Sequence, residues 1–95
     1  MILRIVKMSF DPAKVPDFLA LFNSQQSQIR NFPGCTHLEL WEAIPESNVL
    51  FTYSHWASEA ALENYRHSTL FAGVWAATKV LFNAKPEAWS VVRKM

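Results

Sequence analysis

Apolar residues either alternate between two faces or recur at helical spacing along most of this chain, and that pattern predicts its elements. Ile2 to Phe10 is rich in β-branched and apolar residues, which predicts a strand, and Asp11-Pro12 then turns the chain. The period changes in the next segment, where apolar residues fall at helical spacing at Val15, Phe18, Leu19, Phe22 and Ile29. We therefore expect a helix from Val15 or Pro16 to about Asn31, ended by Asn31-Phe32-Pro33-Gly34.

The remaining sequence predicts three more strands and two more helical pieces. The strands are Cys35 to Ala43, Val49 to Trp56 and Ala88 to Arg93, with a turn over Ile44 to Asn48 between the first two. Ser58 can cap a helix that runs to about Arg66, because its side chain can accept a hydrogen bond from a free backbone N–H. Ser68 can cap a further helix that presents Phe71, Val74, Trp75, Thr78, Leu81 and Phe82 on one face.

The resulting order is β-α-β-β-α-α-β in a single domain over residues 1–95. This is the ferredoxin-like split βαβ arrangement of the α+β class, with a four-stranded antiparallel sheet and its main helices on one face. In the third strand, Val49, Phe51, Tyr53 and His55 oppose Leu50, Thr52, Ser54 and Trp56, and neither set is polar enough to face water. Since the helices cover only one face, we expect a second copy to cover the other, sheet to sheet, in a homodimer.

Composition and charge exclude several classes of protein. The chain is 51% hydrophobic with 4 Trp, 7 Phe and 2 Tyr, an aromatic content that a partner subunit or a pocket has to accommodate. A net charge of +1 with dispersed charges excludes a nucleic-acid-binding stripe, and no apolar run predicts a membrane span. Arg4 and Lys7 interrupt any signal peptide, and the single Cys35 rules out a disulfide within the chain or a cysteine-built metal site. We therefore expect a cytoplasmic protein.

Three segments resemble the antibiotic biosynthesis monooxygenase family. They are VPDF from Val15, FPGC from Phe32, and WASEAALENYRHSTLF from Trp56 to Phe71. The resemblance extends over almost the whole chain and implies a dimeric α+β barrel. The superfamily includes cofactor-independent oxygenases, quinol oxidases, haem degraders and isomerases, so that the fold alone does not give the reaction.

The residues that distinguish these branches are only partly present. Haem degraders use an Asn, a Trp and a His where this chain has Val6, Tyr65 and Trp75, so that the iron ligand is missing and the resemblance implies no haem. Polyketide-tailoring oxygenases use a Trp that is kept here as Trp56, and an Asn and a Tyr that are Thr52 and Leu62 here. Quinol-oxidising relatives often have a His at the Tyr65 position, where a tyrosine can also carry a proton.

These comparisons lead to a set of candidate site residues. Trp56, Tyr65 and His67 are the candidate catalytic residues, and Thr52, Phe71, Trp75 and Gln25 are the candidates for substrate binding. Each has an alternative: Trp56 and Trp75 can be core, Tyr65 can cover the sheet with its hydroxyl in solvent, and His67 can be a surface residue that caps a helix. Gln25 and Gln26 both interrupt an apolar helical stripe, and at least one must turn outward. His37 and His55 are expected at the dimer interface beside Glu39, and Arg66 is expected to be a solvated helix charge.

The sequence and the resemblance together favour a monooxygenase or oxidase that acts on a small aromatic phenol or quinol without a cofactor or metal. Trp56, Trp75 and Phe71 would bind the ring and exclude water, and Tyr65 or His67 would handle the proton. A small-molecule binding protein without catalysis is one alternative, and an isomerase or lyase on the same barrel is another.

Overall fold

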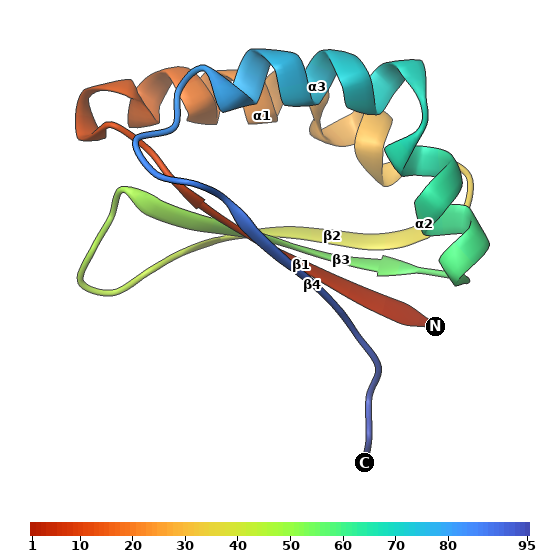
Figure 1. Cartoon of the computed structure of the whole chain (residues 1–95). Coiled ribbons are helices and arrows are strands. Elements are labelled where there is room, and N and C mark those ends of the chain that lie inside the picture. Colours follow the sequence, from red (N-terminus) through yellow and green to blue (C-terminus); the bar gives the residue numbers. More distant parts are fainter.

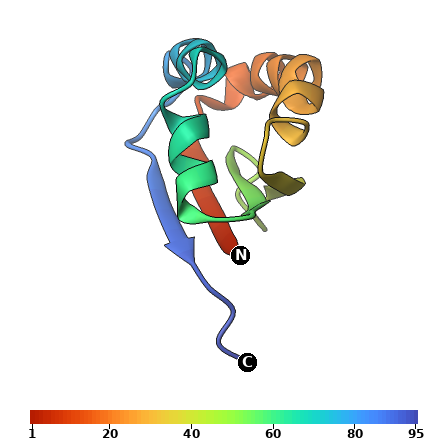
Figure 2. The same cartoon turned by 90° about the vertical axis from the view of Figure 1, so that its right-hand side faces the viewer.

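The computed structural model describes all 95 residues. Its elements are β1 (Ile2–Ser9), the 3-10 turn η1 (Pro12–Lys14), α1 (Val15–Arg30), β2 (Cys35–Glu42), β3 (Val49–Trp56), α2 (Glu59–Arg66), α3 (Thr69–Lys79) and β4 (Glu87–Val91). The strands form one antiparallel sheet in the order β2-β3-β1-β4, and all the helices lie over one face of it (Figure 1). In the view turned by 90°, α1 and α3 lie side by side over the sheet, α2 lies below α3 and nearer the sheet, and the C-terminal residues extend away from the sheet (Figure 2). The predicted α+β, ferredoxin-like fold is confirmed.

Side-chain caps start α2 and α3 where the sequence predicts them. The Ser58 hydroxyl accepts a hydrogen bond from the Ala61 N–H at 3.1 Å, and the Ser68 hydroxyl accepts one from the Phe71 N–H at 3.0 Å. Each bond satisfies a backbone donor that has no partner within its helix. The break between α2 and α3 therefore follows from two caps ten residues apart in the printed sequence.

Two elements end more than one residue away from the prediction. β4 is Glu87–Val91 rather than Ala88 to Arg93, because its length follows its pairing with β1, from Lys7 opposite Glu87 to Leu3 opposite Val91. α3 ends at Lys79, so that Phe82 lies beyond the helix and forms an isolated bridge with Phe10. Both differences depend on contacts between segments far apart in the sequence, which local patterns do not contain.

Gly34 sets the distance between α2 and the start of β2. Its φ of +90° is a conformation that residues with a side chain rarely adopt, and a Cβ added there would lie 2.4 Å from the Cβ of Ala61. The Gly34 carbonyl also accepts a hydrogen bond from the Ala57 N–H at 2.8 Å. A glycine at this position therefore allows α2 to pack closely against the end of the sheet.

The core under the helices consists of two separate clusters at opposite ends of β3. The Trp56 cluster contains Ile29, Cys35, Trp56, Leu62 and Tyr65, and the Phe10 cluster contains Met8, Phe10, Phe18 and Leu50. Only 12 of the 95 residues are buried in the single chain, so that neither cluster is large. The middle of the helix-covered face, between the two clusters, is where a cavity can form.

Candidate functional site

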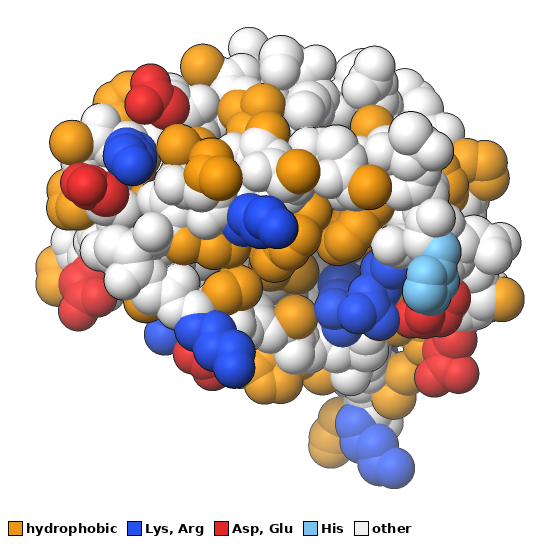
Figure 3. Space-filling model, turned by 45° about the horizontal axis from the view of Figure 1, so that its top comes forward, with side chains coloured by type: hydrophobic (Ala, Val, Ile, Leu, Met, Phe, Trp, Pro, Cys, Tyr) orange, Lys and Arg blue, Asp and Glu red, His pale blue; other side chains and the backbone are white.

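A pocket of about 330 Å³ lies between the sheet and the helices, and residues of both core clusters line it. Fourteen of its 22 lining residues are hydrophobic, and this volume is within the range of small-molecule sites. Figure 3 shows hydrophobic side chains gathered in a hollow of this side of the molecule, with Lys and Arg side chains beside them. The pocket can therefore take an apolar ring and has charged groups within reach.

Aromatic rings form a continuous wall along one side of the pocket. The Trp56 and Tyr65 rings stack at 4.8 Å, Tyr65 meets Phe71 edge to face at 5.2 Å, and Phe71 stacks on Trp75 at 5.8 Å. These separations are typical of favourable aromatic pairs. The structure thus brings together four of the predicted site residues, from β3, α2 and α3, at one pocket.

Trp56 is both a core residue and part of the pocket wall. Its side chain is 1% exposed, and its indole N–H donates to the Ser54 hydroxyl at 2.9 Å. Because that donor already has a partner, Trp56 offers a ligand its ring surface rather than a hydrogen bond. The two interpretations of this residue from sequence are compatible.

Tyr65 is buried, and its hydroxyl makes no hydrogen bond within the chain. Burial, with a smaller contribution from the thiol of Cys35, raises the pKa of Tyr65 to about 12. The phenol therefore stays protonated at neutral pH and can donate a hydrogen bond to a ligand, but it cannot act as a general base there. The alternative in which Tyr65 directs its hydroxyl into bulk solvent does not fit this burial.

The remaining substrate-binding candidates also line the pocket. Thr52 lies on the sheet floor, Phe71 and Trp75 lie on α3, and Gln25 lies on α1 with partial exposure. Gln26 is exposed and donates to the Asn23 side-chain oxygen at 3.1 Å, which makes it the glutamine that turns outward. The sheet side of the lining also includes the small residue Ser54, next to Thr52 on the same face of β3.

His67 lies outside the pocket. Its side chain is 79% exposed and its Nε2 is 3.3 Å from a carboxylate oxygen of Glu63, one turn earlier in the chain. It follows α2 as the residue that ends the helix, where the chain runs over the surface. The structure therefore does not bring His67 to the aromatic wall, and the surface alternative describes its position.

Two arginines that were not among the candidate site residues also line the pocket. Arg4 belongs to β1 and lies on the helix-covered face, and Arg66 is at the end of α2. Arg66 is exposed and pairs with Glu63 at 2.8 Å, so that it is solvated as expected but also stands at the pocket edge. The alternation of β1 could have identified Arg4, because it is the one charged residue among Ile2, Val6 and Met8 on that face.

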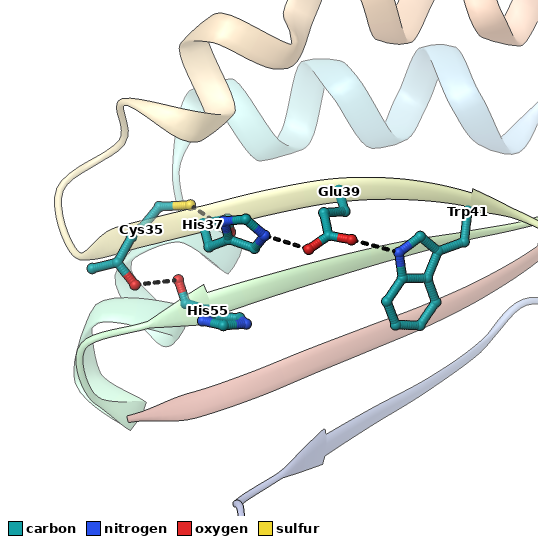
Figure 4. Close-up of polar contacts among 6 residues, drawn as sticks. Cys35, His37, Glu39, Trp41 and His55 are labelled. Atoms are coloured by element: carbon teal, nitrogen blue, oxygen red, sulfur yellow. Dashed lines mark hydrogen bonds and ion pairs between the residues drawn. The ribbon is translucent and has the colours of Figure 1, made fainter.

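The opposite face of the sheet carries a second cluster of aromatic and polar residues. His37 and Trp41, neighbours of Glu39 on β2, both hydrogen-bond to its carboxylate (Figure 4), the Trp41 N–H at 2.8 Å. These bonds hold the pKa of Glu39 below its ordinary value, the one from Trp41 contributing most. The predicted contact of His37 with Glu39 is confirmed, whereas the buried Nε2 of His55 makes no hydrogen bond.

No helix has the combined length and apolarity that crossing a membrane requires. No three side chains from His, Cys, Asp and Glu gather at one place in a way that could hold a metal ion.

Comparisons with known proteins agree on one family. The sequence model of a family described as "Antibiotic biosynthesis monooxygenase" matches residues 1–76. No curated protein matches the sequence.

Solved structures resemble the chain over nearly its full length. A crystal structure named antibiotic biosynthesis monooxygenase is 15% identical, with a TM-score of 0.90 and 98% of each chain covered. A conserved protein from Methanosarcina mazei Go1 is 20% identical, with a TM-score of 0.91, and the match covers 99% of this chain and 94% of that one. A protein from Caulobacter crescentus CB15, titled as a candidate antibiotic biosynthesis monooxygenase, is 23% identical, with a TM-score of 0.88 and coverage of 95% and 86%. At these identities the likeness establishes the fold.

Proposed function

Because the chain belongs to the antibiotic biosynthesis monooxygenase family, we propose that it is a cofactor-independent monooxygenase or oxidase of a small aromatic phenol or quinol. Family membership and the names of the structural neighbours support a monooxygenase-like function in general. The more specific proposal of a small aromatic substrate is supported by the pocket of about 330 Å³, which has a wall of four aromatic rings, Trp56, Tyr65, Phe71 and Trp75. A pocket of this size and lining suits one or two fused aromatic rings.

The proposed reaction uses the substrate as the source of electrons. A quinol that loses two electrons and two protons to O₂ gives a quinone and hydrogen peroxide. In the monooxygenase variant, the quinol supplies four electrons to O₂: one oxygen atom enters the ring, the other leaves as water, and the product is a hydroxyquinone. The protein then has to bind the ring, exclude water and hold the reacting oxygen, which are tasks for an apolar cavity with a few polar groups.

Each lining residue has a task in this proposal. Trp56, Phe71 and Trp75 hold the ring by its faces, and Thr52 and Gln25 supply polar contacts at the floor and at α1. Tyr65, protonated at neutral pH, donates a hydrogen bond to a substrate oxygen. His67 is not part of the site, since its imidazole stands beside Glu63 outside the pocket.

Oxygen consumption with a panel of benzo- and naphthoquinols tests the proposal. We expect uptake of O₂ with formation of quinone by the native protein, and its loss in Val74→Trp, which fills the pocket from α3. Ala72→Trp is the matched control, because Ala72 is exposed on the same helix and does not line the pocket. Equal uptake by both variants, or none by the native protein with any quinol, would contradict the proposal.

A binding protein without catalysis is the second candidate function. It is favoured because neither residue expected to handle the proton can act as a base there: Tyr65 keeps its proton, and His67 lies outside the pocket. In this case quinols would quench the fluorescence of Trp56 and Trp75 with no uptake of O₂. The same panel of compounds therefore separates the two functions.

We also propose that the open face of the sheet is the interface of a homodimer. Trp41, Trp89 and Val91 on this face are 39%, 43% and 39% exposed, and hydrophobic groups of this size are rarely left together in water. The carboxylate of Glu39, which would be covered in such a dimer, already has two donors in His37 and Trp41. Light scattering coupled to size exclusion should give twice the 10.9 kDa mass of the chain, and a monomer at micromolar concentration would contradict the dimer.

A cytoplasmic location is a further part of the proposal, because the single cysteine, Cys35, is free and buried.

A further inference from the structure

Arg4 places a positive charge on the helix-covered face of the sheet, in the wall of the pocket. In the register of the sheet it lies between Ser54 of β3 and Ser90 of β4, while the next residues of β1 on this face are Val6 and Met8. Its exposure is intermediate, so that the guanidinium is partly removed from water. A charge in such a position is costly unless other groups compensate it.

The chain supplies little compensation. One N–H of Arg4 donates to the Ser90 hydroxyl at 2.9 Å, and no carboxylate lies within ion-pair distance of it. A guanidinium has five N–H donors, so most of those of Arg4 are free for another partner. Burial lowers the pKa of Arg4, the positive charge of Arg66 lowers it further, and Glu63 opposes both.

The other ionisable groups at the pocket leave this excess of positive charge in place. Arg66 and Tyr65 come from α2, and Arg66 forms an ion pair with the carboxylate of Glu63 at 2.8 Å. Glu87 of β4 also lines the pocket, and its carboxylate is paired with Lys7 at 3.9 Å. α1, α3, β2 and β3 contribute no ionisable side chain to the lining. Two cations, one of them paired with Glu63, therefore face a cavity whose other lining residues, apart from Glu87, are apolar, aromatic or uncharged polar.

We propose that Arg4, with Arg66 beside it, binds the anionic oxygen of the aromatic substrate, so that a phenol entering the pocket gives up its proton to water and is held as the phenolate. This inference rests on the proposed function and deepens it, because it names the ionisation state in which the substrate is bound. Two adjacent guanidinium groups favour an anion by charge and by several N–H donors at once. The absence of a general base among Trp56, Tyr65 and Trp75 is then no obstacle, since the arginines stabilise the phenolate directly.

Ser90 has a positioning role in this arrangement. Its hydroxyl accepts a hydrogen bond from Nη1 of Arg4 across the β1–β4 pair and thereby orients the guanidinium along the sheet. A purely structural interpretation of the same bond is that Arg4 ties β4 to β1. The two interpretations differ in what the loss of Arg4 does to the ionisation of a bound phenol, which is the property to measure.

The probes are para-nitrophenol, whose phenolate absorbs visible light, and para-nitroanisole, which has nearly the same shape and cannot ionise. We expect the native protein to bind the phenolate at least about tenfold more tightly than the phenol, which appears as a lower pKa of the bound probe in a spectrophotometric titration. Arg4→Met should remove most of this preference, Arg66→Met should reduce it, and Arg4→Lys should restore part of it. Arg93→Met is the control, because Arg93 is exposed in the C-terminal residues and does not line the pocket.

The titration with para-nitroanisole, followed by tryptophan fluorescence, separates the role of Arg4 in binding a phenolate from the proposed function of the pocket. If both Arg4→Met and the native protein bind the anisole equally while only the native protein prefers the phenolate, the inference is supported. If the anisole binds but the native protein shows no preference for the phenolate, the role of Arg4 is refuted and the pocket remains. If neither probe binds the folded native protein, the proposed function fails together with the inference.

Discussion

The two faces of this sheet differ in what covers them and in how fully side chains fill them. The helix-covered face has a layer of helices over it but is not filled, and a pocket of about 330 Å³ remains between the Trp56 and Phe10 clusters. The open face has no layer over it but is crowded with rings, among them Trp41 and Tyr53, which stack at 4.6 Å. Alternate residues of the same strands thus build a cavity on one side and a flat aromatic surface on the other.

The contrast follows from the size of the side chains at the centre of each face. On the covered face, β3 carries Thr52 and Ser54 between Leu50 and Trp56, so that the side chains are small in the middle of this face and large at both ends. On the open face, β3 carries Phe51, Tyr53 and His55 in succession. Large side chains on an uncovered face suit contact with another protein surface, whereas small ones under helices leave room for a ligand.

The largest expected effect comes from placing a charge on the open face. Ile5→Lys should weaken the proposed dimer by at least about 100-fold, since a buried unpaired ammonium costs on the order of 3–5 kcal/mol. The residues directly opposite Ile5 in the sheet are Tyr53 and Trp89, so that no carboxylate lies directly across from the new ammonium. Ala72→Lys on the exposed side of α3 is the control and should leave the association unchanged. Equal dissociation constants by analytical ultracentrifugation would refute the interface.

The next largest effect is expected at Gly34, where α2 packs against the end of the sheet beside the Trp56 cluster. Gly34→Ala should lower the free energy of unfolding by about 3 kcal/mol, because it combines backbone strain with an overlap against Ala61. Gly73→Ala is the matched comparison: nothing lies within 4 Å of its Cβ, and a helical alanine should stabilise α3 by about 0.5–1 kcal/mol. Denaturant unfolding of both variants measures this, and an unfolding midpoint of Gly34→Ala at or above the native one would contradict the predicted strain.

A third prediction uses the ionisation of Tyr65 on the covered face. Because its pKa rises from about 10 to about 12 on folding, the unfolded state releases this proton first as pH increases. The free energy of unfolding should therefore be unaffected below about pH 10 and fall by about 2 kcal/mol between pH 10 and 12. Tyr65→Phe should remove this part of the pH dependence, while Tyr53→Phe on the open face should keep it. A pH profile of Tyr65→Phe identical to that of the native protein would show that the phenol is not buried as described.

The smallest effect is expected at the floor of the pocket. Thr52→Val keeps the shape of the side chain and removes a hydroxyl that makes no hydrogen bond within the chain, so that stability should change by less than about 0.5 kcal/mol. The affinity for a quinol should fall several-fold if that hydroxyl contacts the substrate, as expected for a single hydrogen bond of about 1 kcal/mol. Calorimetric titration checks it, and a large loss of stability would instead indicate a structural role for Thr52.

The sequence was sufficient for features that depend on nearby residues. The alternation of β3 placed Thr52 and Trp56 on one face and Tyr53 on the other, and Ser58 and Ser68 marked the starts of α2 and α3. Helical spacing also brought Phe71 and Trp75 to the same wall. These outcomes follow from the periods of strands and helices and from the chemistry of caps.

Other features were missed or misplaced. His67 follows α2 directly in the chain and its contact with Glu63 is local, but helical spacing did not show on which side of the helix end its side chain would lie. The alternation of β1 could have placed Arg4 on the covered face, but its contact with Ser90, 86 residues away in the sequence, depends on the pairing of β1 with β4. The extent of β4 was likewise set by its pairing with β1. No local pattern encodes these distances.

The most direct test of the account is a methyl NMR titration of the protein with para-nitrophenol, because neighbouring residues of one strand report on opposite faces. Val6 lines the pocket and Ile5, beside it in β1, lies on the open face opposite Tyr53. Ring currents of the bound ligand should shift the methyl signals of Val6, Leu62 and Val74, while those of Leu3, Ile5 and Val91 stay in place. Shifts confined to Leu3, Ile5 and Val91 would place the ligand on the open face and contradict the account.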